Sequence, residues 1–178
     1  MRRPYILTGR GLARTATDVI MSHARFARTS EDMNRKFDGR TTASVHELSL
    51  ATAVLAWEES MPENKRVELA LVLFFHERIE DSTAKFPRWL PQRVKMLVRE
   101  MTFKKGEDKY VAMWKRNKGI LLAELWDCTV NLMANRNNPP DKRVKCQRCV
   151  RRLLRYIKPK YPNLAIIKLA EALLPPIK

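Results

Sequence analysis

The sequence predicts an all-α protein, a compact bundle or array of about seven helices with no sheet. Apolar residues recur at helical spacing along the chain, with interruptions at proline, glycine and asparagine. No stretch alternates cleanly between apolar and polar residues, and no Asn-Gly or Asp-Gly turn joins two β-branched segments. The 178 residues are 45% hydrophobic, enough to bury a core without disulfides. We therefore expect a single helical domain over residues 1–178.

Three helices are expected in the first half of the chain. The first lies within residues 11–36 and ends at Gly39, which can take the left-handed conformation that closes helices. The second begins at Ser44 and the third at Ser60, because each serine precedes a glutamate by three residues, as in a capping box. The third is apolar nearly all round, which predicts the central buried helix. The expected apolar stripe of the second helix consists of Leu48, Ala51, Thr52 and Leu55.

Four helices are expected in the second half. The fourth follows Pro91 and runs to about Phe103, with a break at Gly106. The sixth runs from Asp141 to about Lys158, and the seventh spans about Asn163 to Leu174. The fifth is long, about Glu107 to Asn135, and is closed by two prolines. Its expected core-facing residues are Val111, Trp114, Leu121, Leu122, Leu125, Thr129, Leu132 and Met133.

The charge is unevenly distributed along the chain. Residues 1–89 hold 14 basic and 12 acidic residues, a net charge of +2, whereas residues 90–178 hold 21 basic and 7 acidic residues, a net charge of +14. We therefore distinguish a basic arm with the first helix (1–40), a near-neutral helical part (41–103) and a strongly basic part (104–178). Because self-repulsion of this size destabilises a compact protein, an anionic partner is expected.

The sixth helix carries the main functional signal. On a helical wheel its cysteines, valine, leucines and isoleucine collect on one side and its basic residues on the other, within an arc of about 140°. No acid lies between Asp141 and Glu171, so these cations lack the opposite charges that normally stabilise an exposed helix. Arginine predominates, and its planar fork suits phosphate. The predicted phosphate contacts are Lys145, Arg148, Arg151, Arg152, Arg155 and Lys158, with Lys160 just beyond the helix.

A second basic cluster precedes this helix and is interleaved with aromatic residues. Such mixing permits base stacking beside phosphate contacts, as in single-stranded nucleic-acid binding, although aromatic residues in helices more often belong to the core. The cluster comprises Lys104, Lys105, Lys109, Lys115, Arg116 and Lys118. The candidates for base stacking are Tyr110, Trp114, Tyr156 and Tyr161.

These features predict a non-enzymatic nucleic-acid-binding protein, with RNA favoured over DNA. Phosphate contacts dominate, so sequence specificity should be low. A packaging, coat or sequestering role with self-assembly into a homo-oligomer would suit this chemistry. The alternative is a regulator or adaptor whose basic face meets an acidic protein or an anionic membrane surface, like a matrix protein.

Neither a metal, a cofactor nor a catalytic centre is expected. Cys146-x-x-Cys149 has the spacing of half a zinc site, with Cys128 as a third ligand and a histidine as a fourth. No second such pair follows, and both cysteines fall on the apolar side of the sixth helix, where they pack as small hydrophobic residues. The three histidines are dispersed, and no phosphate loop, nucleophile elbow or paired-carboxylate pattern occurs.

The expected compartment is intracellular, either cytoplasmic or nuclear. Three cysteines do not suggest a disulfide framework. The longest apolar run, Leu69 to Phe75, is far shorter than the roughly 20 residues of a membrane helix. The basic, hydroxyl-rich N-terminus, in which Asp18 is the first acid, offers organellar import as an alternative.

Overall fold

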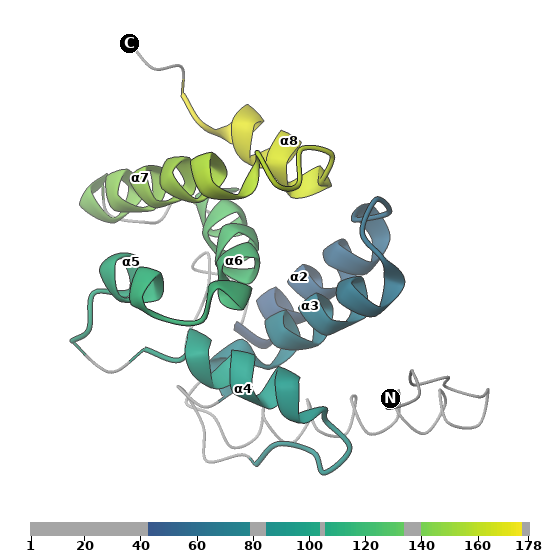
Figure 1. Ribbon diagram of the computed structural model, residues 1–178. Helices are drawn as coiled ribbons and strands as arrows, with labels where there is room; N and C mark the ends of the chain where they lie inside the picture. The colour runs from purple at the N-terminus through teal and green to yellow at the C-terminus, as the bar shows by residue number, and fades with distance from the viewer. Residues whose placement is uncertain (1–42, 79–84, 104–105, 134–139, 176–178) are drawn as a thin grey trace.

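The computed structural model describes residues 43–78, 85–103, 106–133 and 140–175. Within these ranges the chain forms seven α-helices and three 3₁₀ turns and no strand, which confirms the predicted all-α class (Figure 1). The helix expected within residues 11–36 lies outside the described ranges. The elements are α2 (Ala43–Trp57), α3 (Glu63–Phe75), η2 (His76–Arg78), α4 (Gln92–Met101), α5 (Lys109–Ala112), η3 (Met113–Lys115), η4 (Lys118–Ile120), α6 (Leu121–Met133), α7 (Pro140–Ile157) and α8 (Ala165–Leu173).

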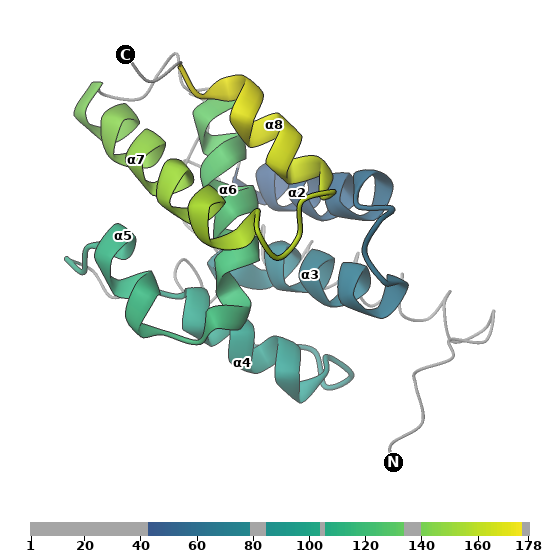
Figure 2. The same ribbon diagram turned by 45° about the horizontal axis from the view of Figure 1, so that its top comes forward.

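Helix α6 occupies the centre of this arrangement. It contacts α7 and α8 on one side and α2 and α3 on another (Figures 1 and 2). Its buried residues include Trp126 and Leu125, and also the polar Glu124, Asp127 and Thr129. The central buried helix is thus α6, and the prediction that the third helix would hold that place was wrong. Helix α3 packs against α2, α4 and α6 but leaves polar residues in its first turns exposed.

Helix α2 uses a different face from the predicted one. Ala51 is buried as expected, but Leu48 and Leu55 are 49% and 46% exposed and Thr52 is also exposed. The face against the core instead carries Leu50 and Val54 together with the polar His46, Glu47 and Glu58. The prediction failed because it assigned polar side chains to solvent, whereas here they serve buried polar contacts.

The start of α3 also differs from the prediction. Its N-cap residue is Pro62, and no side chain caps it. The Ser60 hydroxyl donates instead to the Asn163 carbonyl, 3.3 Å away, so the predicted capping box does not form there. Pro62 suits this position because it has no N–H to leave unpaired.

The long fifth helix is divided into α5, η3, η4 and α6. Arg116 is extended, and the Asn117 side chain accepts a hydrogen bond from the Gly119 N–H at the start of η4. Asparagine favours such caps because its side chain competes for the backbone. A Cβ on Gly119 would lie 3.0 Å from Leu97 Cδ2, so the turn packs closely on α4. The break also leaves Val111, predicted to face the core, 54% exposed.

The other helices follow the sequence pattern closely. Val94, Leu97, Val98 and Met101 form the buried face of α4. Gly106 has a φ of 87°, the left-handed conformation expected at the break after α4. Met133 at the end of α6 is 54% exposed, contrary to its predicted core position. Among the residues that the structure describes, no helix is long and apolar enough to cross a membrane.

A buried carboxylate joins the first and last described helices. Helix α8 begins at Leu164 without a side-chain cap of its own. Glu58, just after α2, accepts hydrogen bonds from the N–H groups of Ala165 and Ile166, at 2.9 and 3.0 Å. A carboxylate at a helix N-terminus is stabilised by the unpaired N–H groups and by the helix dipole. This contact fixes α8 to the near-neutral part of the chain.

Replacing Glu58 should destabilise the fold. Glu58→Ala leaves two N–H groups of α8 without an acceptor in a buried site, and we expect a loss of about 2–4 kcal/mol in the free energy of unfolding. Glu58→Gln, which keeps an acceptor without the charge, should cost about 1 kcal/mol. Urea denaturation followed by circular dichroism measures both. The matched control is the exposed Glu59→Ala, which should change the free energy of unfolding by no more than about 0.5 kcal/mol. A loss in Glu58→Ala no larger than in this control would argue against the capping role of Glu58.

Candidate nucleic-acid interface

The two faces of α7 are separated as the helical wheel predicts. Cys146, Cys149, Val150, Leu153, Leu154 and Ile157 are all buried. Lys145, Arg148, Arg152 and Arg155 are exposed, and Arg151 is half-buried. The exposed side is therefore cationic from Lys145 to Arg155, and the apolar side is covered by α5, α6 and α8.

The edge of α7 beside α8 is held by internal contacts. The Arg151 guanidinium donates to the Pro175 carbonyl at 2.8 Å. The Lys158 ammonium lies 2.5 Å from Glu171 Oε1 in an exposed ion pair. These contacts compete with phosphate, so Arg151 and Lys158 are less available than the sequence suggests.

The opposite edge of α7 meets the second basic cluster at Trp114. The Arg152 guanidinium carbon lies 4.1 Å from the centre of the Trp114 ring, and the Lys118 ammonium lies 5.7 Å from it. The Tyr156 ring packs edge-on against Trp114 at 5.9 Å, and the Lys160 ammonium lies 3.8 Å from the Tyr156 ring centre. A hydrogen bond from Lys160, together with its positive charge, lowers the pKa of the Tyr156 hydroxyl. Cation–π contacts thus bring cations from two separate segments onto one surface.

Between these edges lies the middle of the exposed side of α7. Within the described ranges, no ion pair involves Arg148 or Arg155, which stand in the middle of the exposed side of α7. We define the basic face as those predicted phosphate contacts that are exposed and likewise outside these ion pairs: Lys115, Lys118, Lys145, Arg148, Arg152, Arg155 and Lys160.

Two residues of the predicted second cluster turn inward. The Lys109 ammonium lies 2.5 Å from Asp127 Oδ2 and 3.2 Å from Glu124 Oε2, both buried. The Arg116 guanidinium donates to the carbonyls of Glu100 and Thr102, at 2.9 and 2.6 Å, and pairs with Glu107. Both cations serve the fold, because carboxylates and carbonyls already occupy their donors. Lys104 and Lys105 lie outside the described residues.

The four candidate stacking residues differ in accessibility. Tyr110 is half-buried against the core, and burial raises the pKa of its hydroxyl well above the usual value. Trp114 and Tyr156 are half-buried and engaged with each other and with cations. Tyr161 is 53% exposed beside Lys160. Of the four, Tyr161 is thus the best placed to stack on a base.

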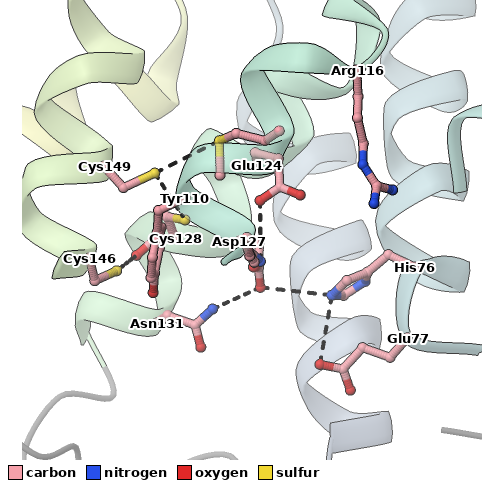
Figure 3. A network of polar contacts seen from close by, with 12 residues as sticks. His76, Glu77, Tyr110, Arg116, Glu124, Asp127, Cys128, Asn131, Cys146 and Cys149 are labelled. Carbon is pink, nitrogen blue, oxygen red and sulfur yellow. Dashed lines mark hydrogen bonds and ion pairs between the residues drawn. The ribbon is translucent and has the colours of Figure 1, made fainter. Parts of the chain in front are cut away.

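A polar network lies beneath this surface, around the Asp127 carboxylate of α6 (Figure 3). Asp127 Oδ1 accepts the Asn131 amide at 2.8 Å and lies 3.3 Å from His46 Nε2 and 3.8 Å from His76 Nε2. The other oxygen, Oδ2, meets Lys109. One side chain therefore contacts groups from α2, η2, α5 and α6 in the buried core.

The burial of this network determines how its acids and its base titrate. Burial favours the neutral form of Asp127, but Lys109, His46 and His76 outweigh it and hold the pKa of Asp127 well below the usual value. Burial likewise lowers the pKa of Lys109, yet Asp127 and Glu124 raise it well above normal. Burial raises the pKa of Glu124 to about 8, because Lys109 only partly offsets it and Cys128 and Asp127 lie close. Lys109 and Asp127 thus form the ion pair, and Glu124 is neutral at pH 7.

The three cysteines lie together on the other side of α6. Cys128 Sγ is 3.9 Å from Cys149 Sγ, and the Cys146 thiol donates to the Cys128 carbonyl at 3.2 Å. Figure 3 shows Cys128 facing the cysteines of α7 and Asp127 facing His76. All three thiols are buried and free of disulfides. The packing of Cys146 and Cys149 agrees with their expected place on the apolar side of α7.

Sequence reasoning missed His46, His76 and Asp127 as a group. The histidines are 30 residues apart and Asp127 follows 51 residues after His76, so no short motif joins them. One signal was present: His46-Glu47 and His76-Glu77 repeat the same dipeptide on two successive helical segments. The Glu47 carboxylate accepts the Glu77 N–H at 3.2 Å, which brings the two dipeptides side by side.

No known protein family, no curated protein and no solved structure matches this chain.

The raised pKa of Glu124 predicts a pH dependence of stability. Folded Glu124 keeps its proton up to about pH 8, whereas the unfolded chain releases it near pH 4.5. Between these values the contribution of Glu124 to stability falls as the pH rises, by about 1.4 kcal/mol per pH unit. Glu124→Gln removes this contribution, so the variant should gain stability relative to the wild type from pH 5 to 8.

Urea denaturation at several pH values in metal-free buffer measures this difference. The exposed Glu59→Gln serves as the control and should leave the slope unchanged. A constant difference between Glu124→Gln and the wild type across this range would show that Glu124 is ionised throughout.

Proposed function

We propose that this protein binds nucleic acid through the basic face, with phosphate contacts dominant, sequence specificity low and RNA preferred over DNA. The observation that carries the proposal is the outward side of α7 beyond Asp141, which holds no acid and where Arg148 and Arg155 stand between two edges fixed by internal contacts. Cations of one sign on a packed helix repel one another, and a phosphate backbone relieves that repulsion.

The distribution of acids supports this reading. Glu58, Glu124 and Asp127 are buried and engaged with backbone or Lys109, and Glu68 pairs with Arg93 far from α7 in the sequence. The acids are thus placed where they neutralise or cap internal groups. The basic face has the composition of a surface that meets a polyanion.

Several of these cations are held in fixed positions. This favours binding of a phosphate backbone over neutralisation by mobile counter-ions. Trp114 holds Arg152 through ring contact, and Tyr156 holds Lys160 in the same way. Holding long side chains in place lowers the entropy lost on binding. Tyr161 adds an exposed ring beside these cations, an arrangement typical of single-stranded RNA recognition.

A role in packaging or sequestering RNA follows from this chemistry, with several copies aligned so that their basic faces follow one strand. No activity of an enzyme is proposed. An acidic protein or an anionic membrane would compete for the same cations, and the experiments below separate these partners from nucleic acid.

Reversing charge in the middle of the basic face should weaken RNA binding. We expect Arg148→Glu with Arg155→Glu to raise the Kd for a single-stranded RNA at least tenfold and to reduce the salt slope by about 2, because two phosphate contacts are lost. Fluorescence anisotropy at several salt concentrations measures both quantities. Arg152 is left unchanged because it also packs on Trp114.

The matched control is Lys85→Glu with Arg88→Glu, which alters net charge equally at exposed positions before α4. Equal weakening of RNA binding by both double variants would indicate that RNA is attracted by the net charge of the protein and not by the basic face. Wild-type binding weaker than micromolar at low salt would contradict the proposal, and binding to anionic vesicles or an acidic peptide alone would assign the face to those partners.

Tyr161 should distinguish single strands from duplexes. If a base stacks on this ring, Tyr161→Ala should weaken single-stranded RNA binding by about 1–3 kcal/mol while Tyr161→Phe preserves it. Duplex binding should be nearly unchanged, because paired bases are not available for stacking. Anisotropy with matched single- and double-stranded RNA tests this. Equal losses on both, or none on either, would remove Tyr161 from the proposed surface.

A further inference from the structure

Two histidines and an aspartate lie close together in the core, although they are far apart in the sequence and form no short motif. One ligand atom from each of His46, His76 and Asp127 lies within 4.8 Å of the other two. His46 and Asp127 are each 3% exposed and His76 is 6% exposed. We infer that His46, His76 and Asp127 form a binding site for one Zn²⁺ ion, which departs from the expectation drawn from the sequence.

The distances between the three ligand atoms suit a tetrahedral ion. Bonds of 2.0–2.1 Å to nitrogen and oxygen place neighbouring ligands about 3.3 Å apart in a tetrahedron. The two measured separations from Asp127 Oδ1 are 3.3 Å to His46 and 3.8 Å to His76. Closing around an ion requires shifts of only a few tenths of an ångström for this pair of contacts. The site is therefore assembled by the fold itself.

The ring of His76 is oriented for a cation. Its Nδ1 lies 2.7 Å from the Leu73 carbonyl, which can only accept, so this nitrogen carries the proton. Nε2 then faces two carboxylate oxygens, Asp127 Oδ1 and Glu77 Oε1, both at 3.8 Å. Nitrogen and oxygen lone pairs that face one another repel, and a cation placed between them relieves this repulsion. A ring nitrogen fixed by a carbonyl is also the usual setting of a metal-bound histidine.

The aspartate is held in the same manner. Asn131 donates to Oδ1 and Lys109 donates to Oδ2, at 2.8 and 2.5 Å. Metal-bound carboxylates are typically fixed by such outer hydrogen bonds. The Glu77 carboxylate, whose side chain is 12% exposed, is the candidate for the fourth ligand position.

The ligand types and the burial select the kind of metal. Two imidazoles and a carboxylate suit Zn²⁺ better than Mg²⁺ or Ca²⁺, which take oxygen ligands. The ligands come from α2, η2 and α6, so the ion would join three segments of the core. A buried, closed site of this kind is structural, and its binding free energy stabilises the fold. This inference is independent of the proposed nucleic-acid binding.

Metal binding by the full-length wild type is the first test. After removal of metal with EDTA and desalting, Zn²⁺ titration against a chromophoric chelator should show one equivalent bound, with a Kd below about 1 µM. Thermal denaturation should move to higher temperature with Zn²⁺. Folded protein that binds no Zn²⁺ would overturn the inference.

Co²⁺ substitution identifies the ligands without any mutation. Nitrogen and oxygen ligands give visible tetrahedral Co²⁺ bands without strong sulfur-to-metal absorption in the near ultraviolet. Strong sulfur absorption would place the metal at Cys128, Cys146 and Cys149 and would refute the histidine site. This measurement remains decisive even where a ligand variant fails to fold.

Variants then assign the residues. His46→Gln and His76→Gln should each lower Zn²⁺ affinity by about 100-fold or more, with folding checked by circular dichroism. The matched controls are His23→Gln, the third histidine, and Cys149→Ser, and both should bind Zn²⁺ like the wild type. Unchanged affinity in the folded histidine variants, or a loss confined to a control, would contradict the assignment.

Discussion

A carboxylate buried at the centre of α6 sets the conditions for the rest of this fold. An ionised group in a dry core is tolerated only when several partners surround it, and Asp127 obtains them from four segments. Each partner must come within hydrogen-bonding reach of one side chain, so the helices that carry them have little freedom in how they pack. Lys109 gives the clearest case. An uninterrupted helix would carry Lys109 along the axis of α6, 18 residues before Asp127 and out of its reach. The chain therefore turns at Arg116–Gly119, and α5 folds back against α6.

The same constraint explains the contrast between interior and surface. Three acidic residues are drawn into the core, where Glu58 caps α8 and Glu124 and Asp127 surround Lys109. The cations of α7 receive no such partners in its middle section, since the neighbouring α5 and α8 engage only the two edges of the helix. The positive surface is thus a consequence of where the acids are needed. The chain has a net charge of +16, so its excess positive charge is left to be neutralised by an anionic partner.

The sequence predictions were accurate where the structure depends on residues close together in the sequence, and they failed where it depends on residues far apart. Helix α7 was predicted well because its wheel depends only on its own residues, with apolar and basic side chains fully separated. Helix α2 was predicted on the wrong face because His46 and Glu47 were assigned to solvent, and the groups that make their burial favourable lie far along the chain. The cap of α8 by Glu58 spans 107 residues and has no local signature. For the basic face, the sequence identifies which residues are cationic but not which of them are exposed. Only the structure separates Arg148, which points outward, from Lys109 and Arg116, which turn inward.

The buried network and the basic face depend on different contacts. Helix α7 is fixed by its own apolar side, by the cysteines against α6 and by α8, none of which involves the histidines. Lys115 and Lys118 instead follow α5, whose position depends on the ion pair between Lys109 and Asp127. Loss of the Lys109 charge, or of a metal ion bound at Asp127, should therefore disturb Lys115 and Lys118 on the α5 side of the basic face before it disturbs Arg148 and Arg155. Because Trp114 connects the two sides through Arg152, its ring is the point at which a change in the core would first reach the surface.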